Sequence, residues 1–383
     1  MPGAQVEPNP CVTCHATIAD ERLAAPAKSF ESDIHYNRGL GCEACHGGDP
    51  GAPGLNAMAP AAGFVGKPDR RDIPAMCGRC HSDASYMRRY STKMAVDQLA
   101  EYKKSVHGLR LAELDDEKVP TCTECHSVHS IRSPSDPRSR VYVKNVPETC
   151  SSCHADSAYM ASYDIPTDQL EQYRSSVHWQ QISAAGDLSA PTCNDCHSNH
   201  GPAPAGLSWV GDACGTCHAG MAESYGKSRH AKILTLMGLP GCITCHENHA
   251  VKEAADSMLG VEDGAVCARC HVAGAGGGVG AEEMKTAIDS LRRRVKAVSD
   301  QLERAASSGV EVSETQLDLE GAGNAIVRAR AAVHTFQVDS VVDAVSSGLE
   351  IAGRTGIRAQ AALRQLSVRR IWLSVLVTVI GIL

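Results

Sequence analysis

The chain has 383 residues, among them 18 cysteines, 17 histidines and 34 glycines, whereas Phe, Trp and Tyr together make up only 4%. So few aromatic side chains exclude an ordinary globular enzyme, because a domain of this size normally fills its interior with aromatic and branched aliphatic groups. A net charge of −7 also argues against a nucleic-acid binder, which would need a basic surface for phosphate groups.

The cysteines form nine C-x-x-C pairs, a histidine directly follows each pair, and no cysteine is left over. This spacing is typical of c-type haem attachment, because the two thiols can add to the vinyl groups of one porphyrin while the next imidazole binds its iron. Zinc ribbons do not need a histidine after every pair, and a disulfide scaffold does not explain the repeated two-residue spacing. We therefore predict nine covalently bound c-type haems.

The predicted attachment residues are Cys11, Cys14, Cys42, Cys45, Cys77, Cys80, Cys122, Cys125, Cys150, Cys153, Cys193, Cys196, Cys214, Cys217, Cys242, Cys245, Cys267 and Cys270. The predicted proximal iron ligands are His15, His46, His81, His126, His154, His197, His218, His246 and His271. Only about 29 residues accompany each motif between Cys11 and His271, too few to isolate the rings from one another. We expect short helices, long irregular connections and almost no sheet around a continuous chain of haems.

The motifs occur in repeated two-motif units. The stretch from Asp83 to Met87 returns at Asp156 to Met160. A Tyr-x-x-Ser-x-His block occurs at Tyr102 and returns at Tyr173. Tyr225 keeps its Ser and His at the same offsets. Each unit is therefore expected to contain one motif, a short helix with a histidine, and a second motif, with the tyrosines packed against haem faces.

Eight histidines remain as distal ligands for nine irons: His35, His107, His129, His178, His200, His230, His249 and His334. Four of them precede a second motif, and we expect His35, His107, His178 and His230 to serve the haems at Cys42, Cys122, Cys193 and Cys242. Three follow a second motif by three residues, and we expect His129, His200 and His249 to serve the first haems of their own units, at Cys77, Cys150 and Cys214. His334 is then left for the haem at Cys267.

The first unit has Asp49 where a histidine would follow the second motif, so the haem at Cys11 lacks a candidate imidazole. Three interpretations of its sixth position remain open. The thioether of Met58 could bind the iron, as methionine does in other cytochromes. Met58 could instead only pack against a ring, since methionine is an adaptable filler. The position could also be open, which would make this haem a candidate catalytic site.

The C-terminal part contains no cysteine. We expect a nonahaem domain over residues 1–272, a Gly-rich linker over 273–280 and a helical domain over 281–370. The helical domain should contain an apolar seam beginning at Met284, a second helix opened by Ser313 and carrying His334, and a third helix from about Asp339 to Arg370.

Residues 371–383 are uncharged and nearly all apolar. A membrane span needs about 20 such residues, so this run could start a transmembrane helix or could be a tail buried in a partner, and we favour the helix. No apolar signal segment is visible in residues 1–10. Because this type of haem attachment takes place outside the bacterial cytoplasm, we expect a removed or omitted leader.

Charge is divided unevenly along the chain. Residues 281–370 carry a net +1 and the last 13 residues none, which leaves −8 on residues 1–280. We therefore expect the redox-active part to attract basic faces of partner proteins, with encounter rates that depend on salt.

Several stretches resemble a family of membrane-anchored bacterial multihaem c-type cytochromes, grouped with cytochrome c3-like and doubled C-x-x-C-H proteins. These stretches are Gly41 to Pro50, Gly63 to Pro68, Pro191 to His197 and the Tyr-x-x-Ser-x-His blocks. The resemblance covers most of residues 11–271. It implies a C-terminal membrane helix and respiratory electron transfer between a quinone-linked membrane cytochrome b and other periplasmic carriers.

We therefore predict an electron carrier rather than an enzyme, mainly α-helical with extensive coil, on the periplasmic side of the cytoplasmic membrane. Two alternatives remain. One is a multihaem oxidoreductase with an open catalytic haem at Cys11, although no C-x-x-C-K motif is present. The other is a cytochrome filament, in which a histidine of one copy ligates a haem of the next.

Overall fold

The computed structural model describes residues 9–204, 206–207 and 210–382. Over these residues it contains α-helices, short 3-10 and π segments and no β-strand, as expected for a mainly helical protein with much coil. The chain forms two compact units. Unit 1 comprises Met1–Ala213 and Asn248–Lys252, and unit 2 comprises Cys214–Glu247 and Glu253–Leu383.

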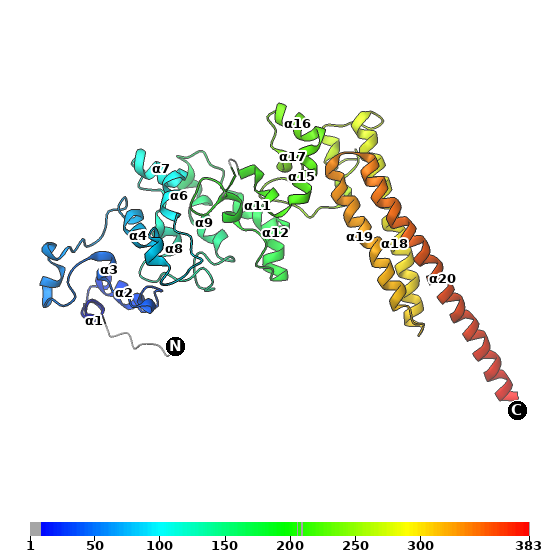
Figure 1. The fold of residues 1–383 in the computed structure, drawn as a ribbon, viewed down its shortest axis with the longest axis horizontal. Coiled ribbons are helices and arrows are strands. Elements are labelled where there is room, and N and C mark those ends of the chain that lie inside the picture. Colours follow the sequence, from blue (N-terminus) through cyan, green and yellow to red (C-terminus); the bar gives the residue numbers. More distant parts are fainter. Residues whose placement is uncertain (1–8, 205, 208–209, 383) are drawn as a thin grey trace. The chain divides into compact units, whose positions relative to one another are not determined.

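Unit 1 consists of short helices joined by long connections (Figure 1). These helices are α1 (Pro10–His15), α2 (Glu21–Phe30), α3 (Glu43–His46), α4 (Ile73–His81), α5 (Ala84–Met87), α6 (Gln98–Lys104), α7 (Val106–Glu113), α8 (Cys122–His126), α9 (Val146–His154), α10 (Ser157–Met160), α11 (Gln169–Ser175), α12 (Val177–Gln180) and α13 (Cys193–His197). Its buried apolar residues, such as Phe30, Leu111 and Ile182, are spread along the chain. Such a thin side-chain core fits a domain whose interior is filled by another group.

Unit 2 begins with α14 (Cys214–Cys217), α15 (Ala219–Lys227), α16 (Arg229–Leu236) and α17 (Gly241–His246). Three long helices follow and lie side by side as a bundle (Figure 1): α18 (Gly276–Ser307), α19 (Ser313–Ala332) and α20 (Val338–Ile382). Two apolar clusters fill the bundle. One surrounds Ile288 and Leu291, and the other surrounds Val298 and Leu302.

The predicted boundary between haem domain and helical domain differs from the structure. Unit 2 contains three of the motifs together with the bundle, because side chains connect them. Both guanidinium nitrogens Nε and Nη2 of Arg330 donate to the carboxylate of Asp256, each at 2.8 Å. Arg292 of α18 approaches the same carboxylate at 3.6 Å. Asp256 is 9% exposed, so this contact attaches the segment after the eighth motif firmly to the bundle.

The expected Gly-rich linker is largely helical, since α18 begins at Gly276. The glycines there permit close packing. A Cβ atom on Gly277 would lie 2.4 Å from the imidazole of His271, and one on Gly278 would lie 2.0 Å from the carbonyl oxygen of Val272. Contact between the bundle and the last motif, rather than flexibility, therefore explains these glycines.

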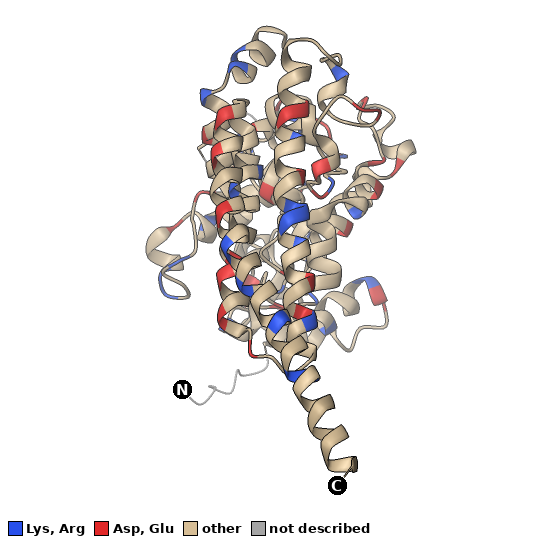
Figure 2. Ribbon diagram, turned by 90° about the vertical axis from the view of Figure 1, so that its right-hand side faces the viewer, with Lys and Arg blue, Asp and Glu red and all other residues tan. Residues whose placement is uncertain are grey.

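The third predicted helix and the apolar tail form one continuous helix, α20, which extends beyond α18 and α19 (Figure 1). Its first part is buried in the bundle through residues such as Val341, Ala352 and Ala359. Its last part carries no charged residue (Figure 2). Within the described residues, α20 is the one helix long and apolar enough to cross a membrane, and its apolar window is not buried by the rest of the chain.

Candidate functional site

The repeated Tyr-x-x-Ser-x-His block places a histidine on a helix of fixed position. The hydroxyl of Ser105 accepts a hydrogen bond from the Gly108 amide, so that Ser105 caps α7 and His107 becomes its second residue. The Tyr102 hydroxyl donates to the Pro120 carbonyl at 2.8 Å, just before the next motif. Ser176 caps α12 and Tyr173 donates to Pro191 in the same way. The tyrosines predicted to pack on haem faces thus also fix the distance between the distal histidine and the following motif.

Among the residues that the structure describes, seven pairs of imidazole rings can be given in which one motif histidine faces one of the predicted distal histidines. Measured between ring centroids, the pairs are His35 with His81 at 6.0 Å, His46 with His129 at 6.0 Å, His107 with His154 at 6.3 Å, His126 with His200 at 6.1 Å, His197 with His249 at 5.9 Å, His230 with His271 at 5.9 Å, and His246 with His334 at 6.1 Å.

This spacing fits an iron between the two rings. Two metal–nitrogen bonds of about 2 Å each, plus about 1 Å from each nitrogen to its ring centre, give about 6 Å. The described residues contain no group of three or more His, Cys, Asp or Glu side chains that could hold a metal ion. A pair of facing imidazoles fits a haem iron, and a haem bound there would supply the remaining iron ligands and one-electron redox chemistry.

The partners within these pairs differ from the expected ones, and the predicted pairing is wrong for all seven. His35, His107 and His230 do not serve the second motif of their own units. They face the motifs at Cys77, Cys150 and Cys267. Each of these is the first motif of the next two-motif repeat in the sequence.

The histidines that follow a motif by three residues face motifs that lie earlier in the sequence. His129, His200 and His249 face the motifs at Cys42, Cys122 and Cys193, each of which belongs to the preceding two-motif repeat. His249 therefore occupies the position that was predicted for His178, which lies in α12. His334 faces the motif at Cys242 instead of the motif at Cys267.

The physical reason why histidines pair with motifs of neighbouring repeats lies in the backbone after each second motif. The next residue has a positive φ in all four cases: 66° at Gly47, 71° at Ser127, 68° at Ser198 and 65° at Glu247. With ψ between 160° and 180° in magnitude, these residues lie in an extended region that only glycine normally occupies, and the motif helix ends there. The following histidine is consequently directed away from its own unit.

The two sets of pairs differ in the angle between the ring planes. At second motifs the planes are nearly parallel, with angles of 22°, 5°, 18° and 20° for His46, His126, His197 and His246. At first motifs the angles are 85°, 50° and 63° for His81, His154 and His271. The two kinds of motif thus form two classes of ligand geometry.

Burial keeps most of these imidazoles neutral, which is the form that binds metals. Desolvation lowers the pKa of ten of them, namely His81, His107, His126, His129, His154, His197, His200, His230, His246 and His249.

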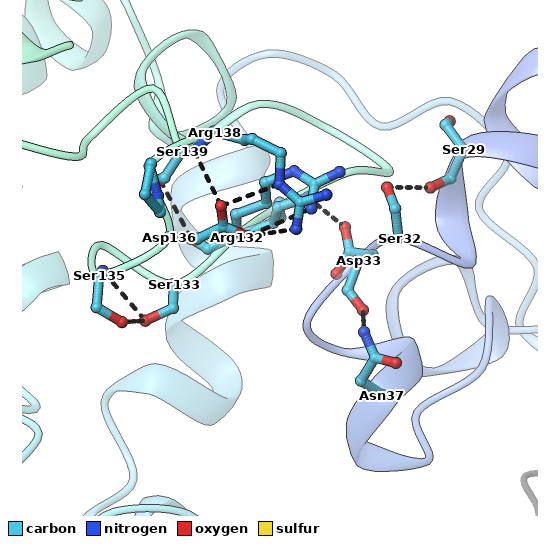
Figure 3. A network of polar contacts seen from close by, with 12 residues as sticks. Ser29, Ser32, Asp33, Asn37, Arg132, Ser133, Ser135, Asp136, Arg138 and Ser139 are labelled. Atoms are coloured by element: carbon cyan, nitrogen blue, oxygen red, sulfur yellow. Dashed lines mark hydrogen bonds and ion pairs between the residues drawn. The ribbon is translucent and has the colours of Figure 1, made fainter.

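Asp33 was not predicted from the sequence, yet it contacts and orients His35, a predicted distal ligand. Its carboxylate accepts hydrogen bonds from Nδ1 of His35 at 2.9 Å and from the amide of Ile131 at 2.6 Å. Burial raises the pKa of Asp33, but these hydrogen bonds outweigh it and hold the pKa below its usual value. Figure 3 shows Asp33 beside Asn37, which donates to its carbonyl, and close to the loop that carries Arg132 and Asp136. A carboxylate on the outer nitrogen fixes the tautomer and raises the basicity of a ligating imidazole.

Other ring nitrogens have weaker partners or none. Nδ1 of His46 donates to the carbonyl of Gly66 at 2.7 Å, and Nδ1 of His334 donates to Ala331 at 3.1 Å. Nδ1 of His230 is buried without a hydrogen-bond partner among the described residues. Phe336 instead stacks on the His230 ring, with centroids 3.8 Å apart. This contact was also missed from the sequence, because a single phenylalanine outside the repeats has no distinguishing pattern.

The cysteines of neighbouring motifs lie close together within each unit of the structure. The sulfur atoms of Cys77 and Cys122 lie within hydrogen-bonding reach of each other. The same contact is present between Cys150 and Cys193. Cys11 is likewise within hydrogen-bonding reach of Cys42. In unit 2, Cys245 lies close enough to Cys267 to interact with it electrostatically. Neighbouring attachment points from Cys11 to Cys193, and those at Cys245 and Cys267, therefore lie close together in the order of the sequence.

The motif at Cys11 differs from the others. No aromatic ring of the described residues faces His15, whereas both histidines at each of seven other sites are paired. Met58 lies half-buried at the end of the 3-10 segment Gly54–Met58. Its ligation of this haem therefore stays a prediction.

Comparisons with known families agree with these observations. Residues 187–272 match the model described as cytochrome c3, residues 116–159 match the doubled CXXCH motif, and residues 2–47 match cytochrome c554 and c-prime. With its paired imidazoles and C-x-x-C-H motifs, the chain is a multihaem c-type cytochrome.

Two curated relatives come from Geobacter sulfurreducens. The chain is 23% identical over 218 residues to the C-type polyheme cytochrome OmcC, and 23% identical over 201 residues to the C-type polyheme cytochrome OmcB. These matches cover 51% and 52% of this chain but only 26% and 21% of the relatives. No solved structure matches the chain significantly.

Proposed function

We propose that this chain is a nine-haem electron carrier, attached to the cytoplasmic membrane by α20, that passes electrons on the periplasmic side between a quinone-linked membrane subunit, such as a cytochrome b, and periplasmic redox carriers. The observation that carries the proposal is the set of seven opposed imidazole pairs. An iron with two strong axial imidazoles is coordinatively saturated, so it can change oxidation state but has no free position for a substrate.

The closely spaced attachment cysteines support conduction, because groups bound there are neighbours in the order of the sequence. The length and composition of α20 support the membrane attachment. The resemblance to membrane-anchored cytochromes supports the partners.

The haem number and ligation can be tested on the purified holoprotein. Intact mass and iron content should give nine haems for each chain. Spectra of the oxidised protein should show eight low-spin irons with two nitrogen ligands. Stepwise reduction should fill all haems with one electron each. Substantially fewer haems, or several high-spin irons, would contradict the proposal.

A second candidate is an oxidoreductase whose reaction takes place at the haem of Cys11. It is favoured by the unpaired ring of His15 within the described structure. Carbon monoxide or nitric oxide should then bind to one haem in nine, and that binding should disappear in a Cys11→Ala/Cys14→Ala variant together with any turnover. A sixth ligand from a second copy would instead make ligation of this haem depend on protein concentration.

A further inference from the structure

The bundle in unit 2 touches the haem-binding residues only near one end. Gly277, in the first turn of α18, lies against His271. The turn between α19 and α20 supplies His334, which faces His246, and Phe336, which stacks on His230. These three contacts come from the beginning of α18 and from the corner between α19 and α20, so one end of the bundle holds the ligands of the motifs at Cys242 and Cys267.

The opposite end of the bundle is close to the start of the uncharged segment. The turn between α18 and α19 contributes Val310 and Val312 to an apolar cluster against which Leu366 of α20 packs. The last charged residue of α20, Arg370, follows four residues later, and only uncharged residues come after it (Figure 2). The bundle therefore separates the ligand-bearing end from the segment proposed to enter the membrane.

The separation can be estimated from the helix itself. α20 runs without interruption from Val338 to beyond Arg370, which is 33 residues or about 50 Å at 1.5 Å per residue. A tilt of up to about 40° would reduce this height to about 40 Å. The bundle itself carries no further haem motif, because residues 272–383 contain no cysteine and His334 as their single histidine.

The bundle is built to keep this length. Gly348 brings α20 so close that an added Cβ atom would lie 2.7 Å from Ala325 of α19 and 2.6 Å from Leu291 of α18. The paired hydrogen bonds between Arg330 and Asp256 fix the ligand-bearing end of the bundle. The helices pack closely along the whole bundle, so the described contacts leave no hinge.

We propose that the α18–α20 bundle is a rigid spacer that holds the haems at Cys242 and Cys267 about 40–50 Å from the membrane surface, so that they exchange electrons with a protein carrier and not with a quinol inside the bilayer. Electron tunnelling falls off exponentially with distance and cannot cross such a gap in one step. For these two haems the partner is therefore one of the proposed periplasmic carriers and not the membrane cytochrome b. Its one-electron redox group lies well outside the membrane, and each transfer oxidises that group by one electron and reduces one ferric iron of this chain. The charge of −8 on residues 1–280 favours a basic docking face on it.

This inference rests on the proposed membrane attachment, and its first test does not depend on electron transfer. The full-length holoprotein is placed in lipid nanodiscs and imaged by electron cryomicroscopy. The iron at Cys242 should lie about 40–50 Å from the headgroups. An iron within one haem width of the headgroups would overturn the inference. A matched variant that lacks residues 371–383 should keep its haems and no longer join the discs.

The second test compares two quinols with the holoprotein in liposomes. Each quinol releases two electrons and two protons and can reduce two ferric irons. A water-soluble quinol should reduce the haems, whereas a long-tailed quinol confined to the bilayer should give no reduction above quinol-free liposomes. Equal reduction by both would overturn the inference. If the water-soluble quinol failed to reduce the haems, the proposed function would be contradicted instead. The distance from the iron at Cys242 to the headgroups would still test whether the bundle is a spacer.

Discussion

His126 and His129 are three residues apart, yet they face different partners: His126 faces His200, and His129 faces His46. Ser127 lies between them and has φ 71° and ψ 177°, a backbone conformation that only glycine normally adopts. A non-glycine residue in this conformation costs of order 1 kcal/mol, and the same cost recurs at Ser198 and Glu247. The repeated strain marks the point at which the chain leaves each of these motifs.

The pairing of His35 with the motif at Cys77 can be tested by combining substitutions. His35→Ala should convert one low-spin haem to high spin, as measured by electron paramagnetic resonance. In a Cys77→Ala/Cys80→Ala background the same substitution should have no further effect, because its haem is already missing. In a Cys42→Ala/Cys45→Ala background the conversion should persist. The reverse result would restore the pairing expected within one unit.

Asp33→Asn should weaken the hold of His35 on its iron by about 10–100-fold, because the carboxylate that orients the imidazole is replaced by a neutral amide. In the reduced protein, carbon monoxide should then displace His35 at one haem. Ser32→Ala is the matched control, since the Ser32 hydroxyl bonds only to the Ser29 carbonyl. Equal carbon monoxide binding by both variants would remove the assigned role of Asp33.

At the scale of elements, α20 combines two functions along one helix, packing in its first part and exposure in its last. Gly348 marks the packed part. Gly348→Ala should destabilise the bundle by about 1–3 kcal/mol, because its Cβ atom would overlap Leu291 and Ala325. Gly353→Ala, at a position with nothing within 4 Å, should instead stabilise the helix by about 0.5–1 kcal/mol. Thermal unfolding of both variants measures the difference, and shifts of the same sign would show that Gly348 is not a packing position.

The two classes of ring angle should be visible in the spectra, because the relative orientation of axial imidazole planes sets the splitting of the iron d orbitals. Haems at Cys42, Cys122, Cys193 and Cys242 should give rhombic low-spin signals with three resolved features. Haems at Cys77, Cys150 and Cys267 should give strongly anisotropic signals dominated by one low-field feature. A spectrum with a single class of signal would contradict the angles.

At the scale of the whole molecule, the uneven charge of the chain predicts salt-dependent partner binding. Reduction by a small basic cytochrome should slow by 10-fold or more as ionic strength rises, since steering by the −8 charge is screened. A small neutral reductant should show no such dependence under the same conditions. Equal salt dependence for both reductants would exclude electrostatic steering.

Much of this architecture could be predicted from the sequence, because haem attachment leaves a local pattern. The motifs, the repeats and the apolar end of α20 all depend on neighbouring residues. The pairing of ligands could not be predicted in the same way, since it joins residues as distant as His46 and His129 and depends on a single backbone angle at Ser127. Asp33 and Phe336 were missed for the same reason, because their partners become neighbours only in the folded chain.

The exchange of histidines between units has a consequence for how such a chain can grow. An internal two-motif repeat supplies one imidazole to the next repeat and one to the preceding repeat. Deleting part of such a repeat would therefore remove a ligand from two irons at once. Duplication or loss of a complete unit preserves the register and leaves every remaining iron with its ligands. If the proposed function holds, the length of the haem chain can therefore be changed in steps of two haems, by recombination in evolution or by design in the laboratory.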